Sequence, residues 1–265
     1  MLHGLGKDFL YSAYRLQPIF ADSIGNTRAV SGTGFFVKNK RDELCLVTNR
    51  HVLDPTFPCY PASWPPNLTL HSIRVAGKAN SAAGKPDVEI DHVITGNFRC
   101  STENDVAVGV NVSFVSGTGP LVIDYFIPYS LIATKDEYDT SISACDLVAF
   151  PGYPEWHDLL SRRPIFRSGT IASDPRYDYS FNGQAKGSCV AYEAFSFGGS
   201  SGSPVFAFQK GLPLGAGLTM QGYKKARLIG VNAGHFDTST EKAKGQHSGI
   251  SYFYKSTAIL ELIDR

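Results

Sequence analysis

The chain has 265 residues, of which 43% are hydrophobic and 18% charged. That length suits one large all-β domain as well as two smaller units, and it allows a sizeable buried core. Lysine and arginine number 25 against 24 aspartates and glutamates, which leaves a formal net charge of +1. This balance gives no electrostatic reason to expect a nucleic acid or an acidic membrane surface as a partner.

The N-terminal residues carry charges among scattered apolar positions, namely Lys7, Asp8 and Arg15. They do not form the continuous apolar segment and small-residue cleavage site of a signal peptide. No run elsewhere approaches the roughly 20 apolar residues that a spanning helix needs. We therefore expect a cytoplasmic protein with no membrane association.

Five cysteines are widely spaced and include no C-x-x-C pair: Cys45, Cys59, Cys100, Cys145 and Cys189. An odd number without paired spacing fits neither a disulfide framework nor a zinc site. We expect reduced, mostly buried thiols and no bound metal.

Short runs of Val, Ile, Thr, Phe and Tyr, bounded by Gly, Pro, Asn and Asp, recur along the chain and predict β-strands. Examples in chain order are residues 13–20, 34–38, 45–48, 105–112, 147–150, 168–171, 203–208 and 227–231. Segments with helical periodicity are scarce, so the fold class is all-β. The end of the chain differs, because Ser256 and Thr257 precede apolar residues spaced for one helix face. A short closing helix is predicted there.

The strand pattern weakens between about residues 113 and 143, where two prolines and the charged cluster from Lys135 to Glu137 occur. This composition is typical of a connection between two β units. We expect the whole chain, 1–265, to form one domain. Its parts are a first β unit, the connection, a second β unit and the helix, over about residues 13–112, 113–143, 144–254 and 255–265.

A histidine and an aspartate lie beside two of the predicted strands. His51 follows the apolar run 45–48, so we expect its imidazole at a strand end, from which it can reach a cleft. Asp105 begins an otherwise apolar strand and would be partly buried. Taken singly, each is most often a structural residue. Together they can supply a base and the carboxylate that orients it, with Glu103 as a weaker rival for the acid.

The segment over residues 198–205, GGSSGSPV, is typical of a loop that presents a nucleophile. Glycines on both sides of a serine allow a tight turn that exposes one hydroxyl. Ser201 has the Gly-x-Ser-Gly frame, whereas Ser200 and Ser203 fit a role in stabilising the turn. A serine hydroxyl is a weak nucleophile unless a base activates it, so Ser201 needs a partner such as His51.

The candidates occur in the order His51, Asp105, Ser201, which is the chymotrypsin order. The segments around them resemble the trypsin-like serine peptidases, and more narrowly their bacterial, HtrA-type branch. The resemblance covers about residues 31–234. Its motifs are GTGFFV at 32–37, VTNRHV at 47–52, NDVA at 104–107, CDLVAFPGYP at 145–154, FRSGTIA at 166–172 and GSSGSPV at 199–205.

This resemblance implies a chymotrypsin-like double β-barrel, with two packed six-stranded barrels and the active site between them. His51 and Asp105 would come from the first barrel and Ser201 from the second. It also implies an oxyanion hole made by the backbone N–H groups of Gly199 and Ser201. The expected activity is that of a serine endopeptidase acting on protein or peptide substrates without metal or cofactor.

Two other functions stay open at this point. The chain can be a latent or inactive module that binds and regulates until a protein partner activates it. Acyl transfer to something other than a peptide is a weaker possibility, because the same triad supports it. The N-terminal region has no Ile-Val-Gly-Gly sequence and no cysteine directly follows His51, so zymogen cleavage and the usual disulfide are not expected.

The resemblance places the substrate pocket along the segment IGVNAGH at 229–235 and in the loop before Ser201. Asn232 stands where some Glu- or Gln-cleaving relatives have a histidine. Phe195, six positions before Ser201, stands where trypsin has an acid, so a preference for basic residues is disfavoured. The pocket candidates are Phe195, Val231, Asn232, Ala233 and Gly234, all of which also suit core or strand-edge roles.

Overall fold

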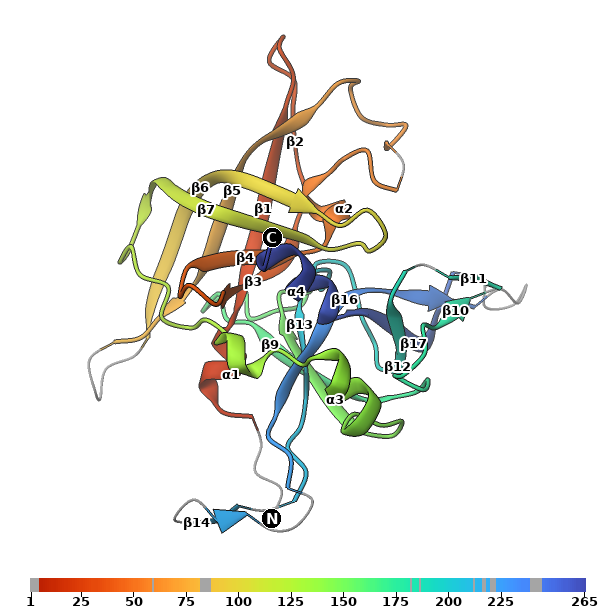
Figure 1. Ribbon diagram of the computed structural model, residues 1–265. Helices are drawn as coiled ribbons and strands as arrows, with labels where there is room; N and C mark the ends of the chain where they lie inside the picture. Colours follow the sequence, from red (N-terminus) through yellow and green to blue (C-terminus); the bar gives the residue numbers. More distant parts are fainter. Residues whose placement is uncertain are drawn as a thin grey trace.

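Figure 1 shows the computed structural model of the chain, in which two β-rich halves pack against each other. The structure describes residues 5–58, 60–81, 87–181, 183–185, 187–211, 213–215, 218–219, 223–238 and 245–265.

The first half is an antiparallel barrel that closes because its first strand pairs with two others. β1 (Ala13–Ala21) pairs with β3 (Gly32–Lys38) on one side and with β5 (Thr69–Ala79) on the other. β4 (Leu44–Thr48), β7 (Ala107–Thr118) and β6 (Val88–Cys100) complete the ring. The short β2 (Thr27–Ala29) adds a seventh strand outside it. Burial along β1 alternates, as expected for a strand with one face toward a core.

The second half is a closed six-stranded barrel. Its strands, in the order of their pairing, are β12 (Cys189–Glu193), β17 (His247–Lys255), β16 (Arg227–Asp237), β13 (Pro204–Ala207), β8 (Leu147–Gly152) and β9 (Ile165–Ile171). Two small hairpins extend from it, β10 (Ser180–Phe181) with β11 (Gln184–Ala185) and β14 (Pro213–Gly215) with β15 (Leu218–Thr219). The double β-barrel predicted from the sequence is confirmed.

Helices in the described part of the chain are short: α1 (Lys7–Tyr11), α2 (Arg50–Leu53), the 3-10 turn η1 (Tyr129–Leu131), α3 (Lys135–Thr140) and α4 (Thr257–Ile263). The predicted closing helix is α4, which lies between the barrels in Figure 1. Its buried side chains, such as Ile259 and Leu262, join one core cluster with Val108 of the first barrel and Phe206 of the second. This shared core fixes the two barrels relative to each other.

The connection between the barrels begins later than the sequence indicates. β7 continues to Thr118, whereas the first β unit was expected to end near residue 112. The signal for the longer strand is the alternation of Val110, Val112 and Phe114, which pack against the core clusters. The charged cluster in the connection forms α3, where the Thr134 backbone N–H donates to the Glu137 side chain at 3.0 Å.

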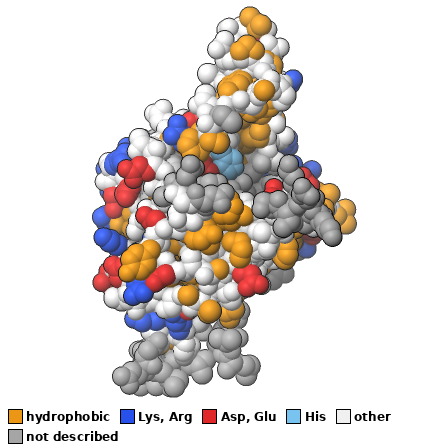
Figure 2. Space-filling view, turned by 90° about the vertical axis from the view of Figure 1, so that its right-hand side faces the viewer, with side chains coloured by type: hydrophobic (Ala, Val, Ile, Leu, Met, Phe, Trp, Pro, Cys, Tyr) orange, Lys and Arg blue, Asp and Glu red, His pale blue; other side chains and the backbone are white. Residues whose placement is uncertain are grey.

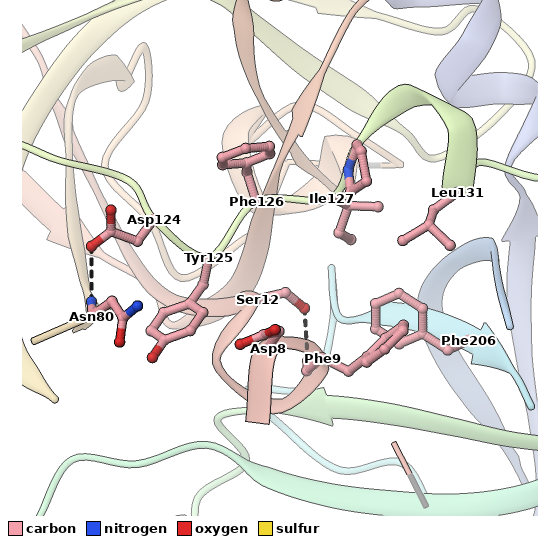
Figure 3. A pocket seen from close by; sticks show the side chains of 11 residues that line it. Asp8, Phe9, Ser12, Asn80, Asp124, Tyr125, Phe126, Ile127, Leu131 and Phe206 are labelled. Atoms are coloured by element: carbon pink, nitrogen blue, oxygen red, sulfur yellow. Dashed lines mark hydrogen bonds between the residues drawn. The ribbon is translucent and has the colours of Figure 1, made fainter. Parts of the chain in front are cut away.

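A cavity of about 440 Å³ lies where α1 meets the connection and the second barrel (Figure 3). Phe9 of α1 packs edge-on against Phe206 of β13, with ring centroids 5.0 Å apart. Tyr125, Phe126 and Leu131 line the same cavity. None of the residues that line this cavity is a site candidate from the sequence.

Among the described cysteines, Cys45 and Cys189 are buried, whereas Cys100 is half-buried and Cys145 is exposed. The expectation of mostly buried thiols therefore holds for only two of them, and Cys59 lies outside the described residues. No helix in the described part of the chain is long and apolar enough to cross a membrane.

Candidate active site

Strand register brings His51 and Asp105 to the same edge of the first barrel. Thr48, at the end of β4, pairs with Ala107, at the start of β7, so the segments flanking these residues leave the barrel side by side. The sequence predicted that His51 lies at the strand end, and this prediction is wrong in detail. His51 lies in the four-residue helix α2, because β4 ends at Thr48 and the chain turns at Asn49.

Both oxygens of the Asp105 carboxylate accept hydrogen bonds from His51. The ring Nδ1 lies 2.5 Å from Oδ2, and the backbone N–H of His51 donates to Oδ1 at 2.8 Å. The Asn49 side-chain amide holds the Asp105 backbone carbonyl at 2.7 Å. With Nδ1–H donating to the carboxylate, the lone pair of neutral His51 is at Nε2. Such a ring is oriented to accept a proton from a neighbouring hydroxyl.

Burial separates Asp105 from its rival. The Asp105 side chain is 8% exposed, while that of His51 is 31% exposed. Glu103 is exposed and forms no hydrogen bond or ion pair with His51 among the described contacts. The neighbouring Asn104 fixes this loop, because its side-chain carbonyl accepts the Ser188 N–H of the second barrel at 2.7 Å. Of the two acids, the structure pairs Asp105 with the histidine.

The loop before β13 turns at two glycines with left-handed backbone. Gly199 has φ +88° and Gly202 has φ +87°, conformations that residues with a Cβ rarely adopt. A Cβ on Gly202 would also overlap the carbonyl oxygen of Thr33. The Ser200 N–H donates to the Phe197 carbonyl at 2.9 Å and closes the first turn. The glycine frame seen in the sequence is therefore required by the geometry.

Thr33 of β3 joins this loop to the first barrel. Its N–H donates to the Ser201 carbonyl at 2.8 Å, and its hydroxyl donates to the Gly199 carbonyl at 2.7 Å. The same hydroxyl accepts the Tyr153 N–H at 3.0 Å. Thr33 was not singled out in the sequence, where it is one residue of a glycine-rich strand. Its contacts place the serine loop beside the barrel edge that carries His51.

The three serines of the loop differ in exposure. Ser200 and Ser203 are buried, and neither hydroxyl has a hydrogen-bond partner among the described residues. Ser201 is half-exposed, and its Oγ lies 3.4 Å from the Ala233 carbonyl. Within the described contacts, Ser201 Oγ forms no hydrogen bond with His51. The contacts therefore join two of the three predicted catalytic residues, His51 and Asp105.

The backbone around Gly199 leaves two N–H groups unengaged. The Gly198 carbonyl accepts the Glu155 N–H at 3.2 Å, which turns that carbonyl toward the segment after β8. Neither the Gly199 N–H nor the Ser201 N–H donates a hydrogen bond to any described residue. Free N–H groups next to a nucleophile are the donors that a developing oxyanion requires.

The predicted pocket residues separate into two groups. Val231, Asn232 and Ala233 are buried, whereas Gly234 is half-buried and Phe195 is 56% exposed. The Asn232 amide donates to the Ser200 carbonyl at 2.8 Å, and its carbonyl accepts the Tyr192 hydroxyl at 2.6 Å. Asn232 therefore supports the serine loop from beneath.

Phe195 lies in a cluster that includes two residues not identified from the sequence. The His247 ring lies 4.8 Å from that of Phe195 and stacks on His235 at 4.2 Å. Arg167 of β9 lies over the Phe197 ring at 4.4 Å and donates to the Phe195 carbonyl at 2.5 Å. Burial and the adjacent His235 lower the pKa of His247, and burial lowers that of Arg167. These residues are far apart in sequence, and no motif links them.

β16 has an open edge next to Ser201. It pairs with β13 only as far as Val231, while its pairing with β17 continues to Asp237. Among the described residues, Gly234 and His235 therefore have no strand partner on the β13 side. An unpaired strand edge can bind an extended peptide through main-chain hydrogen bonds. In the space-filling view of Figure 2, hydrophobic side chains gather around a histidine on the face turned to the viewer.

Two closed six-stranded barrels, with residues of both around Thr33 and the serine loop, define a chymotrypsin-like double β-barrel protein. No family model matches the chain, and no curated protein matches its sequence. Among solved structures, the crystal structure of Deg5 is similar, with a TM-score of 0.51 and 15% identity over 96% of this chain and 88% of that one. At this identity the likeness shows a shared fold.

Proposed function

We propose that the chain is a serine endopeptidase of the trypsin-like type, with Ser201 as nucleophile, His51 as general base and Asp105 as the orienting carboxylate. The observation that carries the proposal is the His51–Asp105 pair, which is held by two hydrogen bonds of 2.5 and 2.8 Å. The same barrel contacts the glycine-framed loop of Ser201 through the Thr33 N–H. The Asp105 carboxylate is the partner that His51 requires to act as a base.

In the proposed reaction, Ser201 Oγ attacks a peptide carbonyl as His51 Nε2 takes the hydroxyl proton. The carbonyl oxygen becomes negative and accepts hydrogen bonds from the N–H groups of Gly199 and Ser201. The C–N bond then breaks, and His51 returns the proton to the departing amine. A water molecule, deprotonated by His51, hydrolyses the acyl-enzyme and restores Ser201. The open edge of β16 suits an extended peptide substrate.

Substrate preference follows from the charges near Phe195. Residues 195–203 contain no carboxylate, and the Arg167 guanidinium donates to the Phe195 carbonyl at 2.5 Å. A lysine or arginine side chain bound there would meet a like charge. We therefore propose that cleavage after basic residues is disfavoured.

Labelling with a serine-directed fluorophosphonate, followed by peptide mapping, tests the assignment. We expect modification at Ser201, complete loss of labelling in Ser201→Ala, and a sharp decrease in His51→Ala. Ser203→Ala is a matched control, because its hydroxyl lies in the same loop but is buried without a described partner. It should label like the wild type. Labelling at another serine would contradict the assignment.

A peptide library incubated with wild type and with Ser201→Ala then separates the possible functions. Cleavage by wild type alone supports an endopeptidase and reports its residue preference. Labelling without cleavage of any peptide would contradict endopeptidase activity and favour acyl transfer. Absence of both, with folded protein, would favour the latent or inactive module.

A further inference from the structure

A second, smaller cavity lies on the outside of the first barrel, where the segment after β8 packs against it. Its volume is about 160 Å³. Arg15 of β1, Arg74 of β5 and Asp91 of β6 line one side, and Tyr153 and Arg162 line the other. None of these residues is a candidate for catalysis or for the substrate pocket.

The strand register explains why the charged residues share one face. Arg15 pairs with Ala76, and Ala76 pairs with Asp91 on the next strand. Arg74 lies two positions before Ala76, so its side chain projects from the same face of β5. Tyr153 directly follows β8, and Arg162 lies further along that segment with φ +48°. The site is therefore built by elements of both barrels.

Positive charge exceeds negative charge around this cavity. Arg74 forms a paired contact with Asp91, both N–O distances being 2.6 Å. Arg162 approaches Asp91 and the adjacent Glu89 only to 3.9 Å. Arg15 forms no hydrogen bond or ion pair with any described residue. Asp91 therefore neutralises Arg74, Arg162 has only long ion pairs, and Arg15 has no carboxylate partner among the described residues.

Tyr153 adds an unpaired buried hydroxyl. The residue is 3% exposed, and its hydroxyl has no hydrogen-bond partner among the described residues. Burial raises its pKa, so the hydroxyl stays protonated and can donate. A buried polar group without a partner is costly unless a ligand or water satisfies it. An acceptor atom in the cavity would satisfy it together with the guanidinium groups.

We propose that this cavity binds a small tetrahedral oxyanion, either inorganic phosphate or the phosphoryl group of a larger molecule, held by Arg15, Arg162 and the Tyr153 hydroxyl. Guanidinium groups form strong, charge-assisted hydrogen bonds with phosphate oxygens. The volume equals that of roughly five water molecules, which accommodates a phosphate group and excludes a whole nucleotide.

Isothermal titration of the full chain with sodium phosphate, at pH 7.5 and constant ionic strength set with sodium chloride, tests the proposal. We expect saturable binding of one phosphate per chain. Arg15→Gln should weaken it about tenfold or more, because a charge-assisted hydrogen bond is lost. Arg28→Gln is the matched control, since Arg28 is exposed on β2 and its side chain bonds only to the Thr27 carbonyl among the described residues; its affinity should equal that of the wild type.

Three further measurements sharpen the test. Tyr153→Phe keeps the buried ring and should weaken binding through the lost hydroxyl alone. If circular dichroism shows that Arg15→Gln is unfolded, Arg162→Gln replaces it in the test. The Arg162 side chain is 58% exposed, so this variant should fold, and it should weaken phosphate binding in the same way. Methyl phosphate distinguishes the two sources: tighter binding than inorganic phosphate assigns the site to a phosphoryl group on a larger molecule, and weaker binding assigns it to the free ion.

Two kinds of result would overturn the proposal. The first is no saturable binding of either phosphate by wild type, or equal affinity in wild type and both arginine variants. The second is acetate binding as tightly as phosphate, which would show that the cavity does not select a tetrahedral anion. Because the readout is binding, neither result depends on whether the chain cleaves peptides.

Discussion

The two halves of the candidate active site are held in place by different kinds of contact. The His51–Asp105 pair lies within one barrel, where the pairing of β4 with β7 sets its geometry. The Ser201 loop belongs to the second barrel, yet its backbone is fixed by Thr33 of the first. The position of the base therefore follows mainly from strand pairing within one barrel, with one added contact between Asn104 and the second barrel, whereas the position of the nucleophile depends on how the barrels pack.

This difference predicts that variants of the two halves will fail in different ways. A change at the His51–Asp105 pair should impair proton transfer and leave the serine loop intact. A change at Thr33 or in the glycine turn should displace the loop and leave the pair intact.

The largest effect is expected for Asp105→Asn. An amide cannot accept the Nδ1–H of His51 with the strength of a carboxylate, and it favours the wrong tautomer of the ring. We expect kcat to fall about 10⁴-fold, with a thermal midpoint close to that of the wild type. Steady-state kinetics on a cleaved peptide measures the loss. A fall of less than about tenfold would show that Asp105 does not orient the base.

Thr33→Val should have the next largest effect on kcat, because Thr33 positions the serine loop and takes no part in the proposed chemistry. The valine removes the hydroxyl that bonds to the Gly199 carbonyl and to the Tyr153 N–H. The backbone between Gly199 and Ser201 then loses one of its anchors, and we expect kcat to fall about tenfold to a hundredfold with little change in KM.

Thr33→Ser provides the matched control, because it restores the hydroxyl and should recover most of the activity. The downfield NMR signal of the His51 Nδ1–H should be unchanged in both Thr33 variants. Its loss in Thr33→Val would show that the two halves are coupled more tightly than the contacts indicate.

Gly202→Ala tests the contact between loop and barrel through stability. A Cβ at Gly202 combines a left-handed backbone with overlap of the Thr33 carbonyl. Gly25→Ala is the control, because Gly25 has φ +93° and nothing within 4 Å of an added Cβ. We expect Gly25→Ala to cost about 1 kcal/mol of unfolding free energy and Gly202→Ala clearly more, by urea denaturation. Equal losses of unfolding free energy in the two variants would mean that the loop can move away from the Thr33 carbonyl without destabilising the protein.

Much of the fold could be predicted from the sequence, because strands carry a local signal. Residues 32–38 and 147–152 combine β-branched and aromatic side chains with glycine or proline at their ends, and both are strands. α2 could not be predicted, since four residues are too few to show helical periodicity. The pairing of His51 with Asp105 was inferred from chain order and resemblance, and the structure brings these two side chains together.

The remaining parts of the site depend on contacts that no local pattern records. Thr33 reaches Gly199 and Tyr153 across 166 and 120 positions of the chain. Asn232 was expected as a pocket residue, yet its amide is fully used beneath the serine loop. A strand residue can face either way relative to a neighbouring loop, and only the packed barrels determine which side chains that loop contacts.

The smallest effect is expected from the pH dependence of His247, beside the same loop. Its ring nitrogens face the backbone N–H groups of Ser196 at 3.1 Å and Gly249 at 2.8 Å. A neutral ring can accept from one of these groups, whereas a protonated ring can accept from neither. Because burial and His235 lower its pKa in the folded protein, the unfolded chain binds more protons below about pH 6.5. This contribution to stability is therefore present above pH 6.5 and is lost as the pH falls.

We expect the unfolding free energy to decrease more between pH 7.5 and pH 5.5 in the wild type than in His247→Gln, as measured by urea denaturation at both pH values. Asp237 and Arg167 also lie near this ring and act in opposite directions on its charge, so the difference should be small. If the unfolding free energy of His247→Gln decreases as much as that of the wild type, protonation of His247 does not destabilise the folded protein at acidic pH.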